Sequence, residues 1–404
     1  LGVAACIKHY AANNQETNRT RNSSQLSERA LREIYLPAFE AAVREADVWS
    51  VMAAYNAVNG VAACENGELL TDRLRHEYGF RGFVVSDWFA ARRTGSAASA
   101  LRAGLNLEMP GKGSKYRAAN LKKEFRAGAF SEAELDACLE PLLRIWLRTQ
   151  HAQRPAGQTQ RNTPEHQQLA RRMAAESITL LKNEGDVLPL QRGRIRRLAV
   201  LGPRANKRNC LPLLGGSAGV WPPYEITPLQ GLKELLGDDC EFVRDPARAD
   251  AAIVFVGLGH GFRRGRDTEG MDRTHMSLPP AQQRLIRETA ASNPHTVVVL
   301  VSGSPLEMDW IDEVPAIVMA WYPGMEGGRA IADVLFGAAN PCGKLPVTFA
   351  RKLSDCAAHR NERQFPGSET EVLYEEDIFV GYRHFDRESI EPLFPFGFGL
   401  SYTR

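Results

Sequence analysis

The chain has 404 residues, which is long enough for two domains because single hydrophobic cores usually stop growing at about 250–300 residues. Its net charge of +2 gives no bulk field that would favour nucleic acid or a membrane surface, and no apolar run approaches the length of a membrane span. The seven cysteines are scattered without a CxxC pair. This pattern argues against a disulfide framework and mildly favours a reducing, cytoplasmic compartment.

The first 150 residues alternate between apolar strand-like runs and amphipathic helices. The chain opens on IKHYAANNQE (7–16), an apolar run that ends in polar residues. A helix is expected over 27–46, with Ser27 as its N-cap. The remaining expected elements are a strand in 48–60, a helix over 65–79, a strand in 82–90, a short run at 105–111 and a long helix over 133–150. Polar residues at strand ends are typical of the active-site face of a (β/α)8-type barrel.

A polar stretch rich in Pro and Gly, 151–166, is expected to be a linker. Beyond it a second α/β pattern begins, with helices predicted over 280–293 and 327–337. Four nearly continuous apolar strands are expected at 197–202, 250–259, 295–303 and 316–324. Such strands are typical of a mostly parallel sheet covered by helices. The last fifty residues are expected to be irregular covering structure.

The expected domains are therefore 1–150, the linker 151–166 and 167–404. A closed barrel needs eight strands and about 250 residues, whereas the first domain holds four strand-like runs. The sequence thus predicts an α/β protein in which a partial (β/α)8-type barrel is followed by an α/β sandwich. We also expect further barrel strands to precede this chain.

Two segments carry residues suited to chemistry. Asp87 ends an apolar strand, where a carboxylate costs free energy unless it is paired or hydrogen-bonded. It could attack a carbon as a nucleophile and form a covalent ester, as retaining glycosidases do, or it could simply be a helix N-cap. A charged loop spans 259–279, at the edge where open α/β sheets bind ligands, although such loops are usually only solvated. The glycines of 257–261 lack dinucleotide-binding spacing, so nucleotide binding is a weak alternative, and the dispersed histidines predict no metal site.

Ten blocks in order resemble glycoside hydrolase family 3, most of all its β-glucosidases. They are IKHYAANNQE, YNAVNG, GFVVSDW, AGLNLEMPG, LLKNEGDVLPL, EGMDR, YPGMEGG, ANPCGKLPVTF, VGYRHFD and PLFPFGFGLSYT. The resemblance implies a (β/α)8-type barrel and an α/β sandwich that both contribute to the active site. One departure is Asn106, where relatives often have Asp; we expect it to be a tolerated packing change.

The resemblance also implies roles for individual residues. Lys8 and His9 match the pair that hydrogen-bonds the sugar hydroxyls, and Asp87 matches the catalytic nucleophile. Trp88 would lie against the sugar and Tyr55 would reach towards the nucleophile. Met52 is a further candidate for the pocket wall, although an ordinary core position is the better explanation for it.

The acid/base residue is either Asp267 or Glu269. Relatives often have Glu-x-Glu-Gly-x-Asp-Arg here, with the first Glu as the expected donor, so Asp267 ranks first and Glu269 second. The expected activity is retaining hydrolysis of terminal β-glucosyl residues in small β-glucosides or oligosaccharides, with no cofactor, metal, nucleic-acid or membrane partner. A β-xylosidase of the same family and an inactive or carbohydrate-binding fragment are the alternatives. The sequence does not indicate an oligomeric state.

Overall fold

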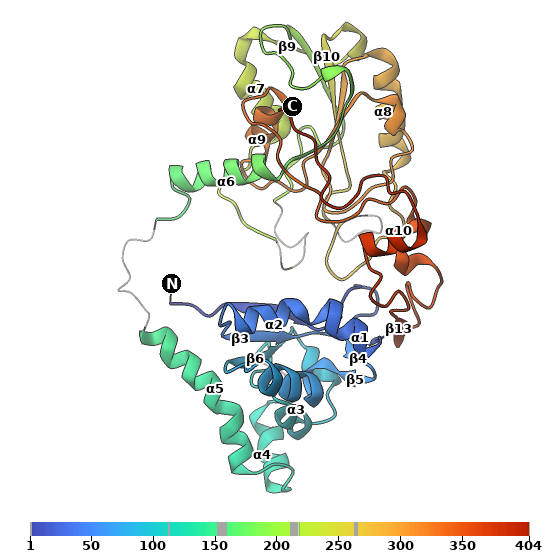
Figure 1. Ribbon diagram of the computed structural model, residues 1–404. Coiled ribbons are helices and arrows are strands. Elements are labelled where there is room, and N and C mark those ends of the chain that lie inside the picture. Colours follow the sequence, from blue (N-terminus) through green and yellow to red (C-terminus); the bar gives the residue numbers. More distant parts are fainter. Residues whose placement is uncertain are drawn as a thin grey trace. The chain divides into compact units, whose positions relative to one another are not determined.

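The computed structural model describes residues 2–111, 114–151, 160–210, 217, 219–261 and 266–403. The chain divides into two compact units (Figure 1). The first comprises 1–159 and 358–380, and the second comprises 160–357 and 381–404. Among the residues that the structure describes, no helix is long and apolar enough to cross a membrane.

The first unit contains a parallel sheet of β1 (Cys6–Tyr10), β3 (Ser50–Ala53) and β6 (Phe83–Ser86), in that order. Leu107 adds an isolated parallel bridge to Val85 of β6. These are the four strand-like runs expected from the sequence. Their parallel order is confirmed, and it places their carboxyl ends at one edge of the sheet.

Helices follow the strands of this sheet, as expected for β/α units. The predicted helix over 27–46 forms in three consecutive pieces, α1 (Glu28–Ala30), η1 (Leu31–Tyr35) and α2 (Pro37–Arg44). Ser27 is its N-cap and accepts a hydrogen bond from the backbone of Ala30, so this prediction is confirmed. The other helical segments of the unit are η2 (Ala63–Glu65), η3 (Glu68–Glu77), η4 (Ala90–Arg93), α3 (Ala97–Ala103), α4 (Ala118–Arg126) and α5 (Glu132–His151).

A second, four-stranded sheet completes the first unit. Its order is β13 (Glu371–Leu373), β2 (Ser23–Gln25), β4 (Ala57–Val58) and β5 (Val61–Ala62). Strand β13 comes from near the end of the chain and pairs in parallel with β2. The Tyr374 hydroxyl also donates to the backbone oxygen of Ala12, at 2.8 Å.

The predicted division at 151–166 stays a prediction, but the compact units differ from it in two respects. Residues 358–380 group with the first unit, because β13 hydrogen-bonds to β2 there. The end of the expected linker is helical, since α6 (Pro164–Ser177) begins inside it with Thr163 as N-cap. Residues 152–159 lie outside the described part of the chain. The last fifty residues are also less irregular than expected, because they include β13 and α10 (Tyr382–Glu388).

The second unit is built on a six-stranded sheet. Its order is β7 (Thr179–Asn183), β12 (Ala316–Met319), β11 (Thr296–Leu300), β10 (Ala251–Val256), β8 (Arg197–Leu201) and β9 (Glu241–Val243). All pairs are parallel except β7 with β12. The four predicted strands are β8, β10, β11 and β12; the sequence did not anticipate the two edge strands.

Helices cover both faces of this sheet, which explains why its central strands are apolar on both sides. Alternate residues of β10 and β11, such as Ile253 and Val297, pack with α6, α7 (Pro228–Leu236) and α9 (Gly327–Leu335). The intervening residues, such as Val254, form a second cluster with Ile286 of α8 (Pro280–Ser292). Figure 1 shows α7 and α9 on one side of the sheet and α8 on the other.

Candidate active site

Most of the predicted site residues lie at the carboxyl ends of β1, β3 and β6 in the first unit. Strand pairing sets their positions: Tyr10 pairs with Ala53 and Ala53 with Ser86, so the residues that follow these strands leave the sheet at one edge. The predicted residues in this group are Lys8, His9, Met52, Tyr55, Asp87 and Trp88. The sheet register therefore gathers side chains that are up to eighty positions apart in the sequence.

Asp87 is held on both of its carboxylate oxygens. His9 Nε2 lies 3.4 Å from Asp87 Oδ2, and the backbone N–H of Trp88 donates to Asp87 Oδ1 at 2.6 Å. The backbone N–H of Asp87 donates to the oxygen of Ala53, at 3.0 Å, which ties this residue to the end of β3. Only 13% of the Asp87 side chain is exposed, against 36% of His9. The carboxylate is thus fixed in direction and remains accessible.

The alternative role of Asp87 as a helix N-cap does not hold. The N-cap position of η4 is Phe89, and no side chain caps this helix. The Asp87 side chain bonds instead to the residue directly after it. A buried thiol, Cys64, lies close enough to feel its charge: burial raises the pKa of Cys64 to about 12, and the negative charge of Asp87 adds to this rise. Cys64 therefore stays neutral around pH 7.

Three further predicted residues present accessible surface at this edge. Lys8 is exposed, and Trp88 is 52% exposed, which is unusual for so large an apolar side chain. Met52 is the one residue of β3 that is not fully buried, so an ordinary core position does not describe it completely. An exposed aromatic ring beside hydrogen-bonding groups suits a sugar, whose C–H faces are apolar and whose hydroxyls are polar.

Sequence reasoning missed Arg19. Its guanidinium carbon lies 4.5 Å from the centre of the Tyr55 ring, and its Nη1 pairs with Glu16 Oε2 at 2.8 Å. Both charged side chains are largely buried. Its position in the sequence was the available signal, because Arg19 comes only three residues after the segment 7–16, which ends in polar residues. The structure thus adds a positive charge next to Tyr55.

The other two predicted carboxylates belong to the second unit, in the loop after β10. Residues 262–265 of this loop lie outside the described part of the chain. Asp267 is surrounded by donors. Its Oδ2 accepts from the Tyr322 hydroxyl at 2.6 Å, the Gly303 backbone at 2.8 Å and the Ser302 hydroxyl at 3.3 Å. Its Oδ1 accepts from the Ser304 hydroxyl at 3.4 Å and lies 3.5 Å from Arg273 Nε.

This cluster anchors the loop. Asp267 and Arg273 are each only 13% exposed, and burial lowers the pKa of the Arg273 guanidinium. The pKa of Tyr322 is raised by burial and by the adjacent Asp267 carboxylate, so the phenol remains a donor. The imidazole ring of His260 packs against the Tyr322 ring, with ring centres 4.1 Å apart. Every contact of Asp267 given above is a donor to its carboxylate.

Glu269 has a different environment. It is partly buried, and its Oε2 accepts from the backbone N–H of Ser217 at 2.7 Å. It follows the anchored Asp267 by two residues on the same loop. Asp267 is thus surrounded by donors from several segments, and Glu269 follows it on the same loop with a backbone partner at Ser217. The order of the two carboxylates as proton donors stays a prediction.

Asn106, the departure noted in AGLNLEMPG, is chemically matched to its position. Its side-chain oxygen accepts from Arg75 Nη2 and from the Val84 backbone, both at 2.7 Å. Its amide nitrogen donates to the oxygen of Cys138 at 2.6 Å. A position that needs both an acceptor and a donor favours an amide over a carboxylate.

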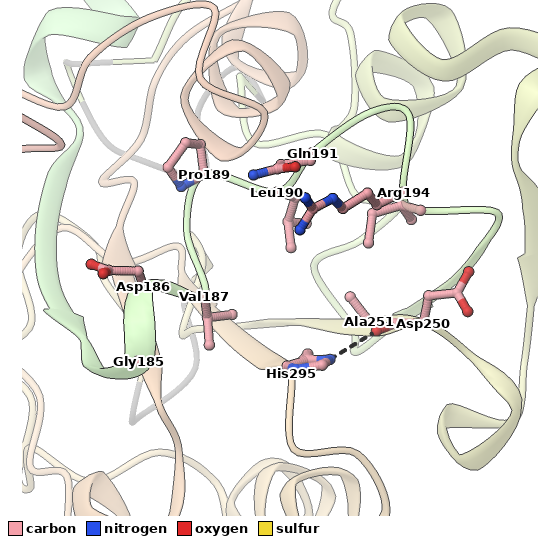
Figure 2. Close-up of a pocket in the computed structure, with 11 residues that line it drawn as sticks. Gly185, Asp186, Val187, Pro189, Leu190, Gln191, Arg194, Asp250, Ala251 and His295 are labelled. Atoms are coloured by element: carbon pink, nitrogen blue, oxygen red, sulfur yellow. Dashed lines mark hydrogen bonds between the residues drawn. The ribbon is translucent and has the colours of Figure 1, made fainter.

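A separate cavity of about 480 Å³ lies at the amino ends of the second unit's strands. It is lined by residues that include Leu190, Arg194, Asp250 and His295, whose Nδ1 lies 3.1 Å from the backbone oxygen of Asp250 (Figure 2). None of the predicted site residues lines it. Because the loop with Asp267 follows the carboxyl end of β10, this cavity is distinct from the candidate site.

Comparison with known proteins identifies the family. Residues 1–145 match the glycosyl hydrolase family 3 N-terminal domain, and residues 178–382 match its C-terminal domain. The chain belongs to glycosyl hydrolase family 3. It is 41% identical over 426 residues to thermostable β-glucosidase B of Acetivibrio thermocellus, covering all of this chain and 54% of that protein.

Solved structures of family 3 enzymes share the fold. A β-glucosidase from Bifidobacterium adolescentis superposes with a TM-score of 0.89 at 36% identity, covering 99% of this chain and 59% of that one. β-Glucosidase 3B of Thermotoga neapolitana, solved in complex with glucose, gives 0.88 at 33% identity, covering 100% and 62%. The predicted fold class is thereby confirmed. The family 3 chain described here spans little more than half the length of these relatives.

Proposed function

We propose that this family 3 protein hydrolyses terminal non-reducing β-D-glucosyl residues of small β-glucosides or oligosaccharides, with retention of configuration. The observation that carries the proposal is Asp87, held beside His9 at the end of β6 with each oxygen oriented by one partner. Its relatives named as β-glucosidases, and the related structure solved with glucose, support the choice of sugar.

In the first step an oxygen of Asp87 attacks the anomeric carbon, forming a glycosyl ester as the bond to the leaving oxygen breaks. We assign to Glu269 the proton donated to that leaving oxygen. In the second step the Glu269 carboxylate takes a proton from water, the water oxygen attacks the anomeric carbon, and Asp87 leaves as a free carboxylate. Lys8, His9, Tyr55, Trp88 and Met52, together with Arg19, are proposed to contact the sugar.

Glu269 is favoured over Asp267 on the contacts of the loop. A general acid must release its proton to the substrate and later recover one from water. Asp267 is surrounded by the Tyr322, Ser302, Ser304, Gly303 and Arg273 donors, which an ionised carboxylate satisfies. We therefore assign Asp267 the role of anchoring the loop that carries Glu269.

The first test is intact-protein mass spectrometry of the naturally expressed protein, before and after 2-deoxy-2-fluoro-β-glucosyl fluoride. This reagent forms the glycosyl ester quickly and hydrolyses it slowly. We expect a gain of one fluoroglucosyl unit, located on the peptide that contains Asp87. The absence of any label would contradict the proposed activity. Preferential labelling by the corresponding xylose reagent, 2-deoxy-2-fluoro-β-xylosyl fluoride, would instead indicate a β-xylosidase.

Azide separates the two acid/base candidates. In Glu269→Ala, azide should attack the glycosyl ester without needing a base, restoring turnover of an activated glucoside and yielding β-glucosyl azide. Asp267→Ala is the matched control and should show no azide rescue. Rescue of Asp267→Ala alone would return the acid/base role to Asp267.

A further inference from the structure

Arg93 lies at the end of η4, six residues after Asp87, and its guanidinium contacts two other loops of the first unit. Nη1 donates to the backbone oxygens of Asn22, at 2.7 Å, and Tyr55, at 3.3 Å. Nη2 donates to the backbone oxygen of Arg21 at 2.8 Å. One side chain thus binds three carbonyls that belong to two separate segments of the chain.

Within the described part of the chain, the guanidinium group of Arg93 binds backbone carbonyls and not a carboxylate. Among the described residues, no carboxylate lies within ion-pair distance of its guanidinium, whereas Arg19 in the same region pairs with Glu16. Arg93 is partly buried, and this burial lowers the pKa of its guanidinium. A partly buried cation costs free energy unless its donors are satisfied, so the three carbonyls must be held in place to receive them.

Each bound carbonyl belongs to a segment that carries a candidate site residue. Arg21 and Asn22 follow Arg19 by two and three residues, and Tyr55 is itself a candidate site residue. The backbone of Arg93 continues the turn that begins at Asp87, where the Ala90 N–H donates to the backbone oxygen of Asp87 at 3.0 Å. The guanidinium group of Arg93 therefore connects the turn that begins at Asp87 to the two segments that carry Arg19 and Tyr55.

We propose that Arg93 is a positioning residue that fixes Tyr55 and Arg19 relative to Asp87. The inference rests on the function proposed above, but the contact it describes does not depend on it. The planar guanidinium is suited to this task because its donors point in fixed directions and reach two loops at once. A lysine ammonium is a point charge and cannot reproduce that geometry.

Three variants test the proposal. Arg93→Lys keeps the positive charge but loses the planar guanidinium group that binds both loops. Arg93→Ala leaves a space that free guanidinium can occupy. Arg92→Met is the matched control, because Arg92 belongs to the same turn but is exposed and stacks on Phe89, with its guanidinium carbon 4.1 Å from the ring centre. Each is compared with the unaltered protein for kcat and KM on an aryl β-glucoside, at a temperature where circular dichroism shows it folded.

We expect kcat to fall about 10- to 100-fold in Arg93→Lys and Arg93→Ala, with a smaller change in KM, because misplacement of reacting groups by about 1 Å costs this much. Added guanidinium should restore part of the kcat of Arg93→Ala and none of that of Arg93→Lys. Arg92→Met should stay within about twofold of the unaltered protein. An unchanged kcat in both Arg93 variants, with only a lower melting temperature, would overturn the proposal.

Hydrogen–deuterium exchange gives a readout that needs no activity. Arg93→Lys should increase exchange in peptides covering 18–25, 54–58 and 86–94, and leave the six-stranded sheet of the second unit unchanged. If the unaltered protein hydrolyses no glycoside, the proposed function fails. A local increase in exchange in Arg93→Lys would still show that Arg93 holds these three segments together. Unchanged exchange in all three segments would reject the proposed role of Arg93, whatever the activity.

Discussion

The two regions that hold the candidate carboxylates position them by different means. Asp87 follows β6, and strand pairing with β3 and one backbone hydrogen bond to Ala53 set its location. Glu269 lies on a loop, and the side-chain cluster around Asp267 sets the course of that loop. Sheet register is specified by many backbone bonds, whereas the loop depends on a few side chains.

This difference explains why the same kind of residue is interpreted differently in the two regions. At a strand end, a carboxylate with one histidine and one backbone partner is oriented and still accessible. In the loop, a carboxylate surrounded by five donors holds the loop in place. The carboxylates of the two regions are thus distinguished by their contacts, and not by their spacing in the sequence.

The largest effect is expected at the strand-end carboxylate. Asp87→Asn removes the nucleophile while keeping an oxygen to accept the Trp88 N–H, so kcat should fall on the order of 10⁴-fold or more, with little change in stability. Steady-state kinetics on an aryl β-glucoside, with a thermal melt of the same sample, would check both. Retention of a tenth of the activity would remove Asp87 from the reaction.

A smaller loss is expected at the loop carboxylate. Glu269→Gln keeps the size of the side chain but removes the acid, so kcat should fall about 10²–10⁴-fold on glucosides with poor leaving groups. The loss should shrink for aryl leaving groups of low pKa, because these depart without protonation. Turnover measured across a series of leaving groups would show how the loss in kcat depends on the leaving-group pKa. A loss independent of the leaving group would count against Glu269 as the acid.

Asp267→Asn sharpens the comparison through stability. The change leaves Arg273, which is 13% exposed, without its charged partner, and it turns one acceptor into an amide facing donors. Unfolding free energy should fall by about 1–3 kcal/mol, since a buried group loses its hydrogen-bonding partner. Denaturant unfolding would measure this, with Asp312→Asn at an exposed position of the second unit as a control. A fully stable Asp267→Asn would show that the cluster does not anchor the loop.

The smallest effect concerns Glu376, near β13 in the segment that returns to the first unit. Burial raises the pKa of its carboxyl above the value in the unfolded chain, even though Gln364 Nε2 donates to it at 3.4 Å. The folded state therefore binds the proton more tightly, and stability is lost as pH rises through the folded pKa. Glu376→Gln should be more stable than the unaltered protein at neutral pH and no more stable below pH about 4. Thermal melts of both proteins across this pH range would check it.

Much of the architecture could be predicted because its causes are local. Apolar runs ended by glycine indicated β8, β10, β11 and β12, and the Ser27 cap marked the start of a helix correctly. The edge strands β7 and β9 were missed, since short strands at a sheet edge carry a weak apolar pattern. The return of 358–380 to the first unit was missed because it depends on pairing between β13 and β2, which are almost 350 positions apart.

The sequence by itself determined the family, the fold class and the position of Asp87 at a strand end, because motif order and apolar patterning are properties of neighbouring residues. Only the tertiary structure decided that Asp267 is engaged by Tyr322, 55 positions away, and that Arg19 stacks on Tyr55. It also decided that Arg93 binds carbonyls about 40 and 70 positions before it. Hydrogen bonds and stacking act over a few ångströms in space, so which side chains meet is fixed only when the chain is folded.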